Sequence, residues 1–215
     1  ILAPKDADFI IYRLLYSLGG LVTESGAPDF LVKLINTGLA GQFIIHMKAA
    51  LCAGVLCASP YILYQLFRFV SPALYVNERK YVVQVVGGGY AMFALGVAVS
   101  YFLIFPLTFR FLGTYQVSGE VENMIALQSY ISTLMTMSLA MGLVFEIPIL
   151  SWLFAKLGFL SADFMRKYRK HAIVVILVVA AIITPTSDVF TLSLVSLPIW
   201  ILYETSILLV SKIHN

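Results

Sequence analysis

The sequence predicts an all-α integral membrane protein, a polytopic bundle of helices, from three observations. Hydrophobic residues make up 60% of the 215 residues and charged residues only 12%, which is more apolar surface than a water-soluble domain buries. The apolar residues form runs close to the roughly 20 residues that a helix needs to cross a bilayer. Lys and Arg are concentrated in alternate connections between these runs. The net charge of +3 is weak evidence for a nucleic-acid partner, and we expect none, because the basic residues instead mark one side of a bilayer.

Five apolar runs are candidate spans. They cover about 44–67, 83–109, 128–155, 172–184 and 189–210. The fourth is the shortest, because 13 helical residues rise only about 20 Å against a hydrocarbon core of about 30 Å. Three explanations stay open: the helix begins earlier, within 164–171, the bilayer is thinner there, or the run is half of a re-entrant hairpin.

The charges of the connections predict the orientation of the chain. Basic residues lie in 68–82, in 156–171 and at Lys212, whereas 111–127 contains Glu120 and Glu122 without Lys or Arg. Short loops rich in Lys and Arg stay in the cytoplasm. We therefore expect a cytoplasmic C-terminus and residues 1–43 on the outer side.

Residues 1–43 have apolar positions that suggest short amphipathic helices on the outer face, with a mobile loop as the alternative. Because the chain opens with Ile1, we expect a preceding span. Prolines inside the runs are expected to kink their helices and curve the bundle. These prolines are Pro60, Pro106, Pro148 and Pro198.

A first candidate site lies in the cytoplasmic loop after the first run, Phe69-Val70-Ser71-Pro72-Ala73-Leu74-Tyr75-Val76-Asn77-Glu78-Arg79. Apolar side chains there form a shallow surface beside the carboxylate of Glu78. A guanidinium group is its natural partner, since its donors bind a carboxylate through two parallel hydrogen bonds. The alternative is that Glu78 only stabilises the N-terminus of the next helix.

A second candidate is Glu146, within the apolar segment 129–154. An ionisable side chain at that depth is costly and more often serves a site or a partner than packing. A neutral carboxyl group can donate a hydrogen bond to a neighbouring helix. Two alternatives stay open: a proton relay, or an internal polar cluster with Gln128, Ser132 or Thr136.

Two further acidic residues have weaker claims to a transport role. Glu204 is eight residues from Lys212, so it can reach the cytoplasmic interface along its helix, which favours a structural role over a role in transport. Asp188, in the turn Thr184-Pro185-Thr186-Ser187-Asp188, is either a helix cap or a participant in transport.

Several functional classes lack their signatures. The spans contain no serine–histidine pair, aspartate pair or zinc motif of an intramembrane protease, so we expect no catalytic residues. The histidines are scattered and no nucleotide-binding loop occurs, so we expect no metal and no cofactor. A secondary transporter of small molecules or ions, with Glu146 in its path, remains the alternative to a receptor for an exported peptide.

Taken in order, three motifs resemble the TatC family, the signal-peptide receptor of the twin-arginine protein export system. They are the Phe-x-x-Pro-x-Leu-x-x-x-Glu-Arg loop at Phe69–Arg79, Phe145-Glu146-Ile147-Pro148, and Thr184-Pro185-Thr186-Ser187-Asp188. The resemblance runs from about Phe43 onward. It implies a glove-shaped bundle of six spans with a concave face, of which five are visible here, in the bacterial inner membrane.

The resemblance also implies roles for particular residues. Glu78, supported by Phe69, Pro72, Leu74 and Arg79, would bind the paired arginines of export signals. Glu146, with Phe145 and Pro148, would contact the single span of a TatA or TatB partner.

Other TatC copies and the lipid bilayer are further implied partners, and the proton gradient is the implied energy source. The chain departs from the family pattern in two places. The first span and its His-x-x-Glu-Leu-Arg leader are absent, and Ala40-Gly41-Gln42-Phe43 stands where many members have Pro and Glu before a Phe.

Overall fold

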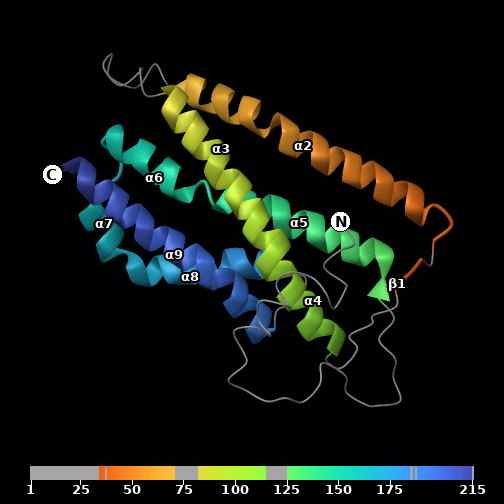
Figure 1. The fold of residues 1–215 in the computed structure, drawn as a ribbon. Coiled ribbons are helices and arrows are strands. Elements are labelled where there is room, and N and C mark those ends of the chain that lie inside the picture. The colour runs from red at the N-terminus through yellow and green to blue at the C-terminus, as the bar shows by residue number, and fades with distance from the viewer. Residues whose placement is uncertain are drawn as a thin grey trace, which may run out of the picture.

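The computed structural model describes residues 34–36, 38–70, 82–114, 125–184, 186 and 188–214. Helices dominate this part of the chain (Figure 1). Their order is α2 (Gly41–Val70), α3 (Val82–Val99), the π-helix η4 (Ser100–Ile104), α4 (Phe105–Thr114), α5 (Leu127–Val144), α6 (Ile147–Lys156), α7 (Ala162–Lys167), α8 (Arg169–Ile183) and α9 (Val189–His214). The predicted all-α membrane fold is confirmed.

Four stretches of helix within the described residues are long and apolar enough to cross a membrane. They are Gly41–Leu66, Val85–Gly113, Leu127–Lys156 and Val189–Ile213. Each overlaps one of the expected spans. The fifth expected span corresponds to α8, whose 15 residues rise only about 22 Å, so its crossing of the membrane stays a prediction.

Helix α8 does begin earlier than its apolar run suggests. It starts at Arg169, and α7 precedes it with only Tyr168 between the two. The Ser161 side chain caps α7 by accepting a hydrogen bond from the Phe164 N–H at 3.2 Å. Helical backbone therefore reaches from the basic connection into the apolar run, as one of the three explanations requires.

Two short strands replace part of the expected outer helices. Strand β1 (Leu34–Ile35) pairs in parallel with β2 (Ile125–Ala126), with Leu34 opposite Ile125. The expectation of a helix is therefore wrong at Leu34 and Ile35, because the segment before α5 offers these residues a backbone partner. The remaining residues of 1–33 lie outside the described part.

The prolines have different local effects. Pro60 leaves the Leu56 carbonyl without its helical N–H, and the Ser59 hydroxyl donates to that carbonyl at 2.7 Å, so α2 continues. Pro106 cannot donate to the Phe102 carbonyl. The π-helix η4 ends at Ile104, two residues before Pro106, and its wider turn accommodates the missing bond. Helix α9 also continues through Pro198. Of these four described prolines, only Pro148 accompanies a break in its helix.

The main core joins α4, η4, α5, α8 and α9. Met137, Met141, Ile104, Val195 and Ala180 are fully buried in it. Three aromatic rings, Phe105, Phe109 and Tyr130, pack together where α4 meets the start of α5. Helix α2 lies at one side of this bundle (Figure 1), against α3 and α5, and is mostly exposed.

Candidate functional site

The predicted loop around Glu78 lies outside the described residues, together with Pro72, Leu74 and Arg79. Phe69 belongs to the last turn of α2. The structure describes the two helix ends that flank this loop: α2 ends at Val70 and α3 begins at Val82. The role of these residues in signal binding remains a prediction.

Glu146 lies at a break in a long helix. Helix α5 ends at Val144, Phe145 and Glu146 form a turn, and α6 begins at Ile147. Pro148 follows in the first turn of α6, where it cannot donate the helical hydrogen bond to the Val144 carbonyl. The proline therefore explains why the helix is interrupted beside the carboxylate.

A glycine on α3 allows the neighbouring helix to approach this break. A Cβ added to Gly96 would lie 2.7 Å from the Met141 carbonyl oxygen and 2.8 Å from the Phe145 Cβ. Real Cβ atoms do not approach so closely, so only glycine fits. On α5, one turn before Phe145, a Cβ added to Gly142 would lie 2.8 Å from the Phe93 ring of α3. The backbones of α3 and α5 are therefore in close contact at the level of Glu146.

Glu146 is buried, with 4% of its surface exposed. Neither carboxyl oxygen has a hydrogen-bond partner among the described residues. A buried polar group without a partner costs about 1–3 kcal/mol. The carboxyl group is therefore held in an apolar setting that does not satisfy it.

The alternative of an internal polar cluster around Glu146 is contradicted, because neither carboxyl oxygen has a partner among the described residues. Gln128 and Thr136 are exposed, and the Ser132 hydroxyl instead accepts a hydrogen bond from Lys48 Nζ at 2.9 Å. Lys48 comes from α2, so this bond joins two helices. No sequence pattern predicts this pair, because the two residues are 84 positions apart.

The residues beside Glu146 are buried as well. Phe145 is 4% exposed and Pro148 is buried. A partner helix therefore cannot reach the Glu146 carboxyl group in this arrangement. Contact requires its side chain to turn outward or the break between α5 and α6 to open.

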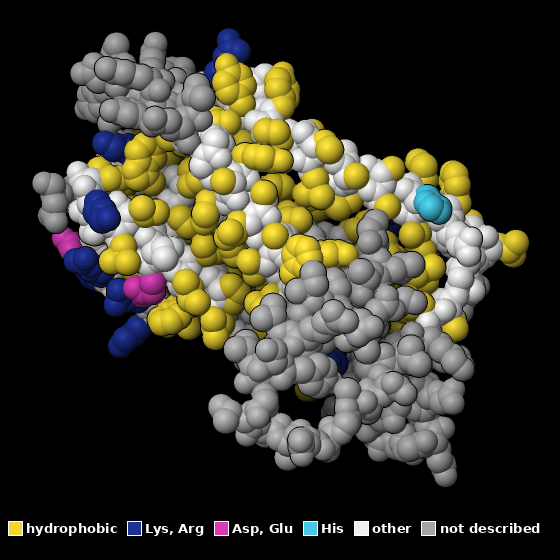
Figure 2. Space-filling view, viewed as in Figure 1, with side chains coloured by type: hydrophobic (Ala, Val, Ile, Leu, Met, Phe, Trp, Pro, Cys, Tyr) yellow, Lys and Arg dark blue, Asp and Glu magenta, His cyan; other side chains and the backbone are white. Residues whose placement is uncertain are grey.

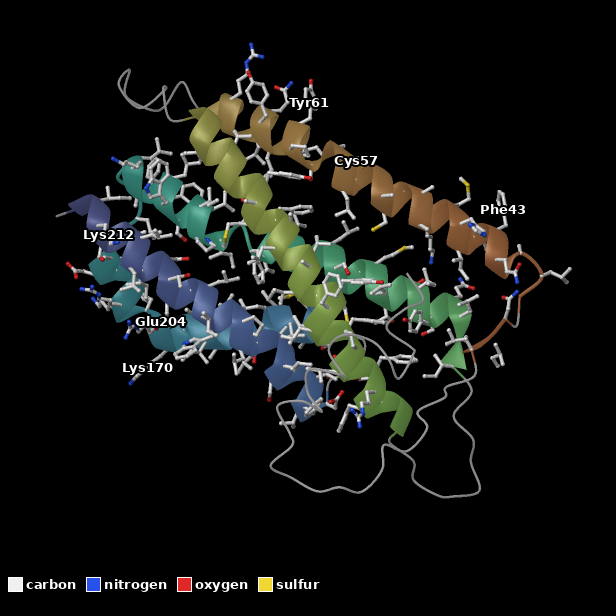
Figure 3. The ribbon with its side chains drawn as sticks, viewed as in Figure 1. Phe43, Cys57, Tyr61, Lys170, Glu204 and Lys212 are labelled. Atoms are coloured by element: carbon white, nitrogen blue, oxygen red, sulfur yellow. The ribbon has the colours of Figure 1, made fainter. Side chains whose placement is uncertain are left out.

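Glu204 has an internal partner. Its Oε2 accepts a hydrogen bond from Arg169 Nη2 at 2.7 Å, which joins α9 to the start of α8. The adjacent Tyr203 hydroxyl donates to the Met165 carbonyl of α7 at 2.8 Å. Figure 3 shows Glu204 at the end of the bundle where Lys170 and Lys212 also lie. The ion pair supports the structural interpretation of Glu204.

Asp188 caps α9. Its carboxylate accepts hydrogen bonds from the Thr191 N–H at 2.9 Å, from the Thr191 hydroxyl at 2.6 Å and from the Thr186 hydroxyl. Burial acts to raise the pKa of Asp188, but these hydrogen bonds outweigh it and hold the pKa below its ordinary value. The prediction of a helix cap is confirmed, and a role in transport stays a prediction.

Other buried polar groups were not expected from the sequence. The hydroxyls of Ser100 in η4, Thr108 in α4 and Thr184 after α8 have no hydrogen-bond partner among the described residues. The sequence feature that could have predicted the π-helix containing Ser100 is Pro106, which lies just after it. No group of three or more metal-binding side chains occurs in the part of the chain that the structure describes.

Comparison with known proteins gives a consistent result. The family model for the Sec-independent protein translocase protein TatC matches residues 5–198. A TatC protein of Blattabacterium sp. subsp. Periplaneta americana is 35% identical over 211 residues, which cover 96% of this chain and 79% of that protein. TatC of Akkermansia muciniphila is 35% identical, with 96% of this chain and 60% of that protein covered. TatC of Desulforapulum autotrophicum is 38% identical over 82% of this chain and 64% of that protein.

Solved structures agree with the sequence relatives. The crystal structure of the twin-arginine translocase receptor TatC superimposes with a TM-score of 0.75 at 31% identity, over 95% of this chain and 87% of that one. The structure of such a receptor in DDM gives a TM-score of 0.74 at 32% identity.

Proposed function

Because the chain belongs to the TatC family of Sec-independent protein translocase proteins, we propose that it is the receptor and core subunit of a twin-arginine export system. It captures twin-arginine signal peptides, recruits TatA or TatB partners, and moves folded proteins across the bacterial inner membrane with the proton gradient. The observation that carries this proposal is Glu146, a buried carboxyl group at a helix break without a partner among the described residues.

The distribution of charge supports the proposed orientation. Figure 2 shows most of the visible Lys and Arg side chains at one end of the molecule. That end holds the end of α2 and the C-terminal end of the chain (Figure 1). We call it the basic end; it includes Arg68, Lys156, Lys170 and Lys212. The basic end faces the cytoplasm in this proposal, since Lys and Arg are retained on that side.

Signal capture occurs at the basic end. The loop with Phe69, Pro72, Leu74 and Glu78 joins the end of α2 to the start of α3. Its carboxylate and apolar side chains suit a peptide that carries paired arginines and apolar residues. Glu204 of α9 also lies at the basic end, but its carboxylate is paired with Arg169, so it is a weaker candidate than Glu78 for binding the arginines of a signal peptide.

Partner recruitment depends on the unsatisfied state of Glu146. A polar side chain from a single-span partner would give its carboxyl group the hydrogen bond that it lacks, which is worth about 1–2 kcal/mol between membrane helices. The break between α5 and α6 allows the local movement that exposes the group. The same energetic argument applies to contact with another copy of the chain.

A secondary transporter has less support. Such a protein would gather several polar groups around a cavity at mid-membrane depth. A surface groove between α8 and α9 is lined by four aliphatic side chains together with Ser196 and Trp200, and Glu146 does not belong to it.

Copurification of a tagged, full-length protein with its single-span partner tests the role of Glu146. Glu146→Ala is expected to lower the recovered partner about tenfold, from the lost interhelical hydrogen bond. Glu204→Ala is the matched control, since it removes a carboxylate that already has an internal partner. Equal loss in both variants, or no loss in Glu146→Ala, would contradict the proposed recruitment.

Crosslinking of an Arg-Arg signal peptide tests the other half of the proposal. Glu78→Ala should lower the crosslinking yield to the full-length protein, while Glu146→Ala should leave it unchanged. A Lys-Lys signal should bind the unaltered protein less well, because ammonium groups cannot form the bidentate pair. An unchanged yield in Glu78→Ala would remove Glu78 from signal binding.

A further inference from the structure

Lys48 is a cation within a mostly apolar helix. It lies seven positions after Gly41, the first residue of α2, about 10 Å from the end of that helix farthest from the basic end. The stretch Gly41–Leu66 is one of the four that are long and apolar enough to cross a membrane. An ionisable side chain inside such a stretch is costly and is normally paired with another group. The partners of Lys48 are therefore informative about what the bundle contacts.

The pairing of Lys48 within the bundle is incomplete. Its Nζ donates one hydrogen bond, to the Ser132 hydroxyl of α5 at 2.9 Å. A lysine ammonium group has three donors, and Lys48 has no ion pair with a described carboxylate. The side chain is exposed, so its positive charge faces outward where α2 meets α5. The two helices therefore present a cation that no described residue neutralises.

The neighbouring side of α5 is polar and uncovered in its first half. Gln128, Ser132 and Thr136 are spaced by four residues, which places them on one side of the helix. Gln128 and Thr136 are exposed, and Ser132 is half-buried. Leu143, which is 66% exposed, continues this side seven residues beyond Thr136 and lies three residues before Glu146. We call this surface the α5 face; it consists of Gln128, Ser132, Thr136 and Leu143.

The hydroxyl groups of α5 differ from those of α9. Every Ser and Thr side chain of α9 has a hydrogen bond, and all except Thr191 donate to a carbonyl of an earlier residue in the same helix. By contrast, no Ser or Thr hydroxyl of α5 donates to a described residue, and Ser132 only accepts a bond from Lys48. Away from water, a hydroxyl group is satisfied by its own helix or by another one. The exposed hydroxyl of Thr136 is therefore open to another helix.

We propose that a single-span partner helix lies along the α5 face and pairs a carboxylate, carried in the outer third of its span, with Lys48. This inference rests on the proposed function, since it extends the partner recruitment assigned to Glu146. The short side chains of Ser132 and Thr136 let a helix approach closely, and their hydroxyls can bond across the contact. Leu143 supplies an apolar contact between this polar region and the helix break.

The depth of the polar side chains favours a helix over a lipid headgroup. The 30 residues of Leu127–Lys156 rise about 45 Å, the thickness of a bilayer with its polar layers, each of which is about 5–8 Å deep. Ser132 lies about 8 Å and Thr136 about 14 Å from the start of α5. A lipid phosphate therefore reaches the level of Ser132 but not that of Thr136. A helix that carries its own polar groups into the hydrocarbon matches both.

A second copy of the chain fits Lys48 less well. Among the described carboxylates, Asp188 is engaged as the cap of α9, Glu204 is in an ion pair, and Glu146 is buried. Asp163 is exposed, but it lies on α7 at the basic end (Figure 1), the opposite end from Lys48. None of these four groups suits a cation near the outer end of α2, so the carboxylate is assigned to the partner.

Copurification of the tagged, full-length protein with its single-span partner tests the pair. Lys48→Met removes the charge and keeps an unbranched side chain, so the recovered partner is expected to fall about fivefold, the size of one polar contact between membrane helices. Lys48→Arg keeps the charge and should retain most of the partner. Lys170→Met is the matched control, since it removes an exposed cation from α8 at the basic end.

A double-mutant cycle separates a direct pair from a structural role of Lys48 between α2 and α5. Neutralising the acidic residue in the outer third of the partner's span should cause the same loss as Lys48→Met, and the two changes together should cause no further loss. If Lys48→Met lowers the thermal midpoint, a charge exchange replaces it: Lys48→Glu should lose the partner and regain it when the partner's acidic residue is replaced by lysine.

Four results would overturn the pair. They are full recovery of the partner in Lys48→Met, additive losses in the cycle, no recovery after the charge exchange, and a partner span without an acidic residue in its outer third. Loss of a differently tagged second copy from Lys48→Met, with the partner retained, would assign the α5 face to another copy and would also contradict the proposal.

Failure of this inference is distinguishable from failure of the proposed function. The levels of Ser132 and Glu146 are about 21 Å apart along α5 and α6, so the two contacts are tested independently. Loss of the partner in Glu146→Ala with full recovery in Lys48→Met would leave recruitment through Glu146 standing and overturn the pair. Full recovery in Glu146→Ala would overturn recruitment through Glu146, whereas the cycle at Lys48 would still decide the pair.

Discussion

Two carboxylates in the helices of this protein have opposite surroundings. Glu204 on α9 is paired with Arg169 at 2.7 Å, and the Tyr203 hydroxyl beside it bonds to Met165. Glu146, between α5 and α6, is almost completely buried and has no hydrogen-bond partner among the described residues. The first carboxylate is used to hold helices together, whereas the second costs free energy in the isolated chain. A group retained at such a cost is the stronger candidate for contact with another molecule.

The largest expected effect comes from replacing Glu146 by an apolar side chain. Glu146→Leu removes an unsatisfied buried carboxyl group, so the free energy of unfolding should stay equal or rise. Export of a reporter with a twin-arginine signal should nevertheless fall about tenfold, since partner contact is lost. Thermal unfolding in detergent and export in cells would measure the two quantities. A large loss of stability would show that Glu146 has a structural partner, as Glu204 does.

The second prediction tests whether close packing of α3 against the break between α5 and α6 stabilises the protein. Gly96→Ala places a Cβ 2.8 Å from the Phe145 side chain, and such overpacking costs about 1–3 kcal/mol. Unfolding titration with denaturing detergent would measure the loss. Gly87→Ala is the control, because no atom lies within 4 Å of its added Cβ. Equal stability of the two variants would mean that α3 can move away from the break without cost.

A third prediction concerns the cap at Asp188. Asp188→Ala should lower the free energy of unfolding by about 1 kcal/mol, whereas Asp188→Asn keeps an acceptor for the Thr191 N–H and should lose less. Similar losses in Ala and Asn would show that the charge matters more than the cap.

The same cap predicts a dependence on pH. The folded pKa of Asp188 is lowered, so its contribution is present above the unfolded pKa of about 3.9 and is lost as the pH falls through the folded value. Thermal midpoints between pH 6 and pH 3 would show this component in the unaltered protein. The component should be absent from Asp188→Asn.

The smallest effect is expected at the paired carboxylate. A double-mutant cycle with Arg169→Ala and Glu204→Ala should give a coupling of about 0.5–1 kcal/mol, because the pair is partly exposed. The Arg166–Asp163 pair, at 3.8 Å and with Asp163 95% exposed, should give none. In Glu204→Ala, export of the reporter should fall only as far as the loss of stability lowers the amount of folded protein. A selective loss of export would place Glu204 in the same class as Glu146.

Much of the architecture follows from patterns local in the chain. Runs of apolar residues were enough to find α2, the α3–α4 helix, the α5–α6 pair and α9, because each helix satisfies its own backbone and needs only apolar length to enter a membrane. Proline at 148 likewise indicated the interruption beside Glu146. The acidic residue in the turn before α9 was recognisable as a cap, since its partner, Thr191, is only three positions away.

The tertiary structure decided which polar groups have partners. Lys48 and Ser132 are 84 positions apart, and Arg169 and Glu204 are 35 apart, so no periodicity in the sequence relates them. The apolar run around Glu146 showed that its carboxyl group is costly, but not that Ser132 would bond elsewhere and leave it unsatisfied. The sequence by itself determined where helices form, because that depends on neighbouring residues. Packing alone determined which carboxylate is satisfied, because hydrogen bonds depend on distances between helices that fold from remote parts of the chain.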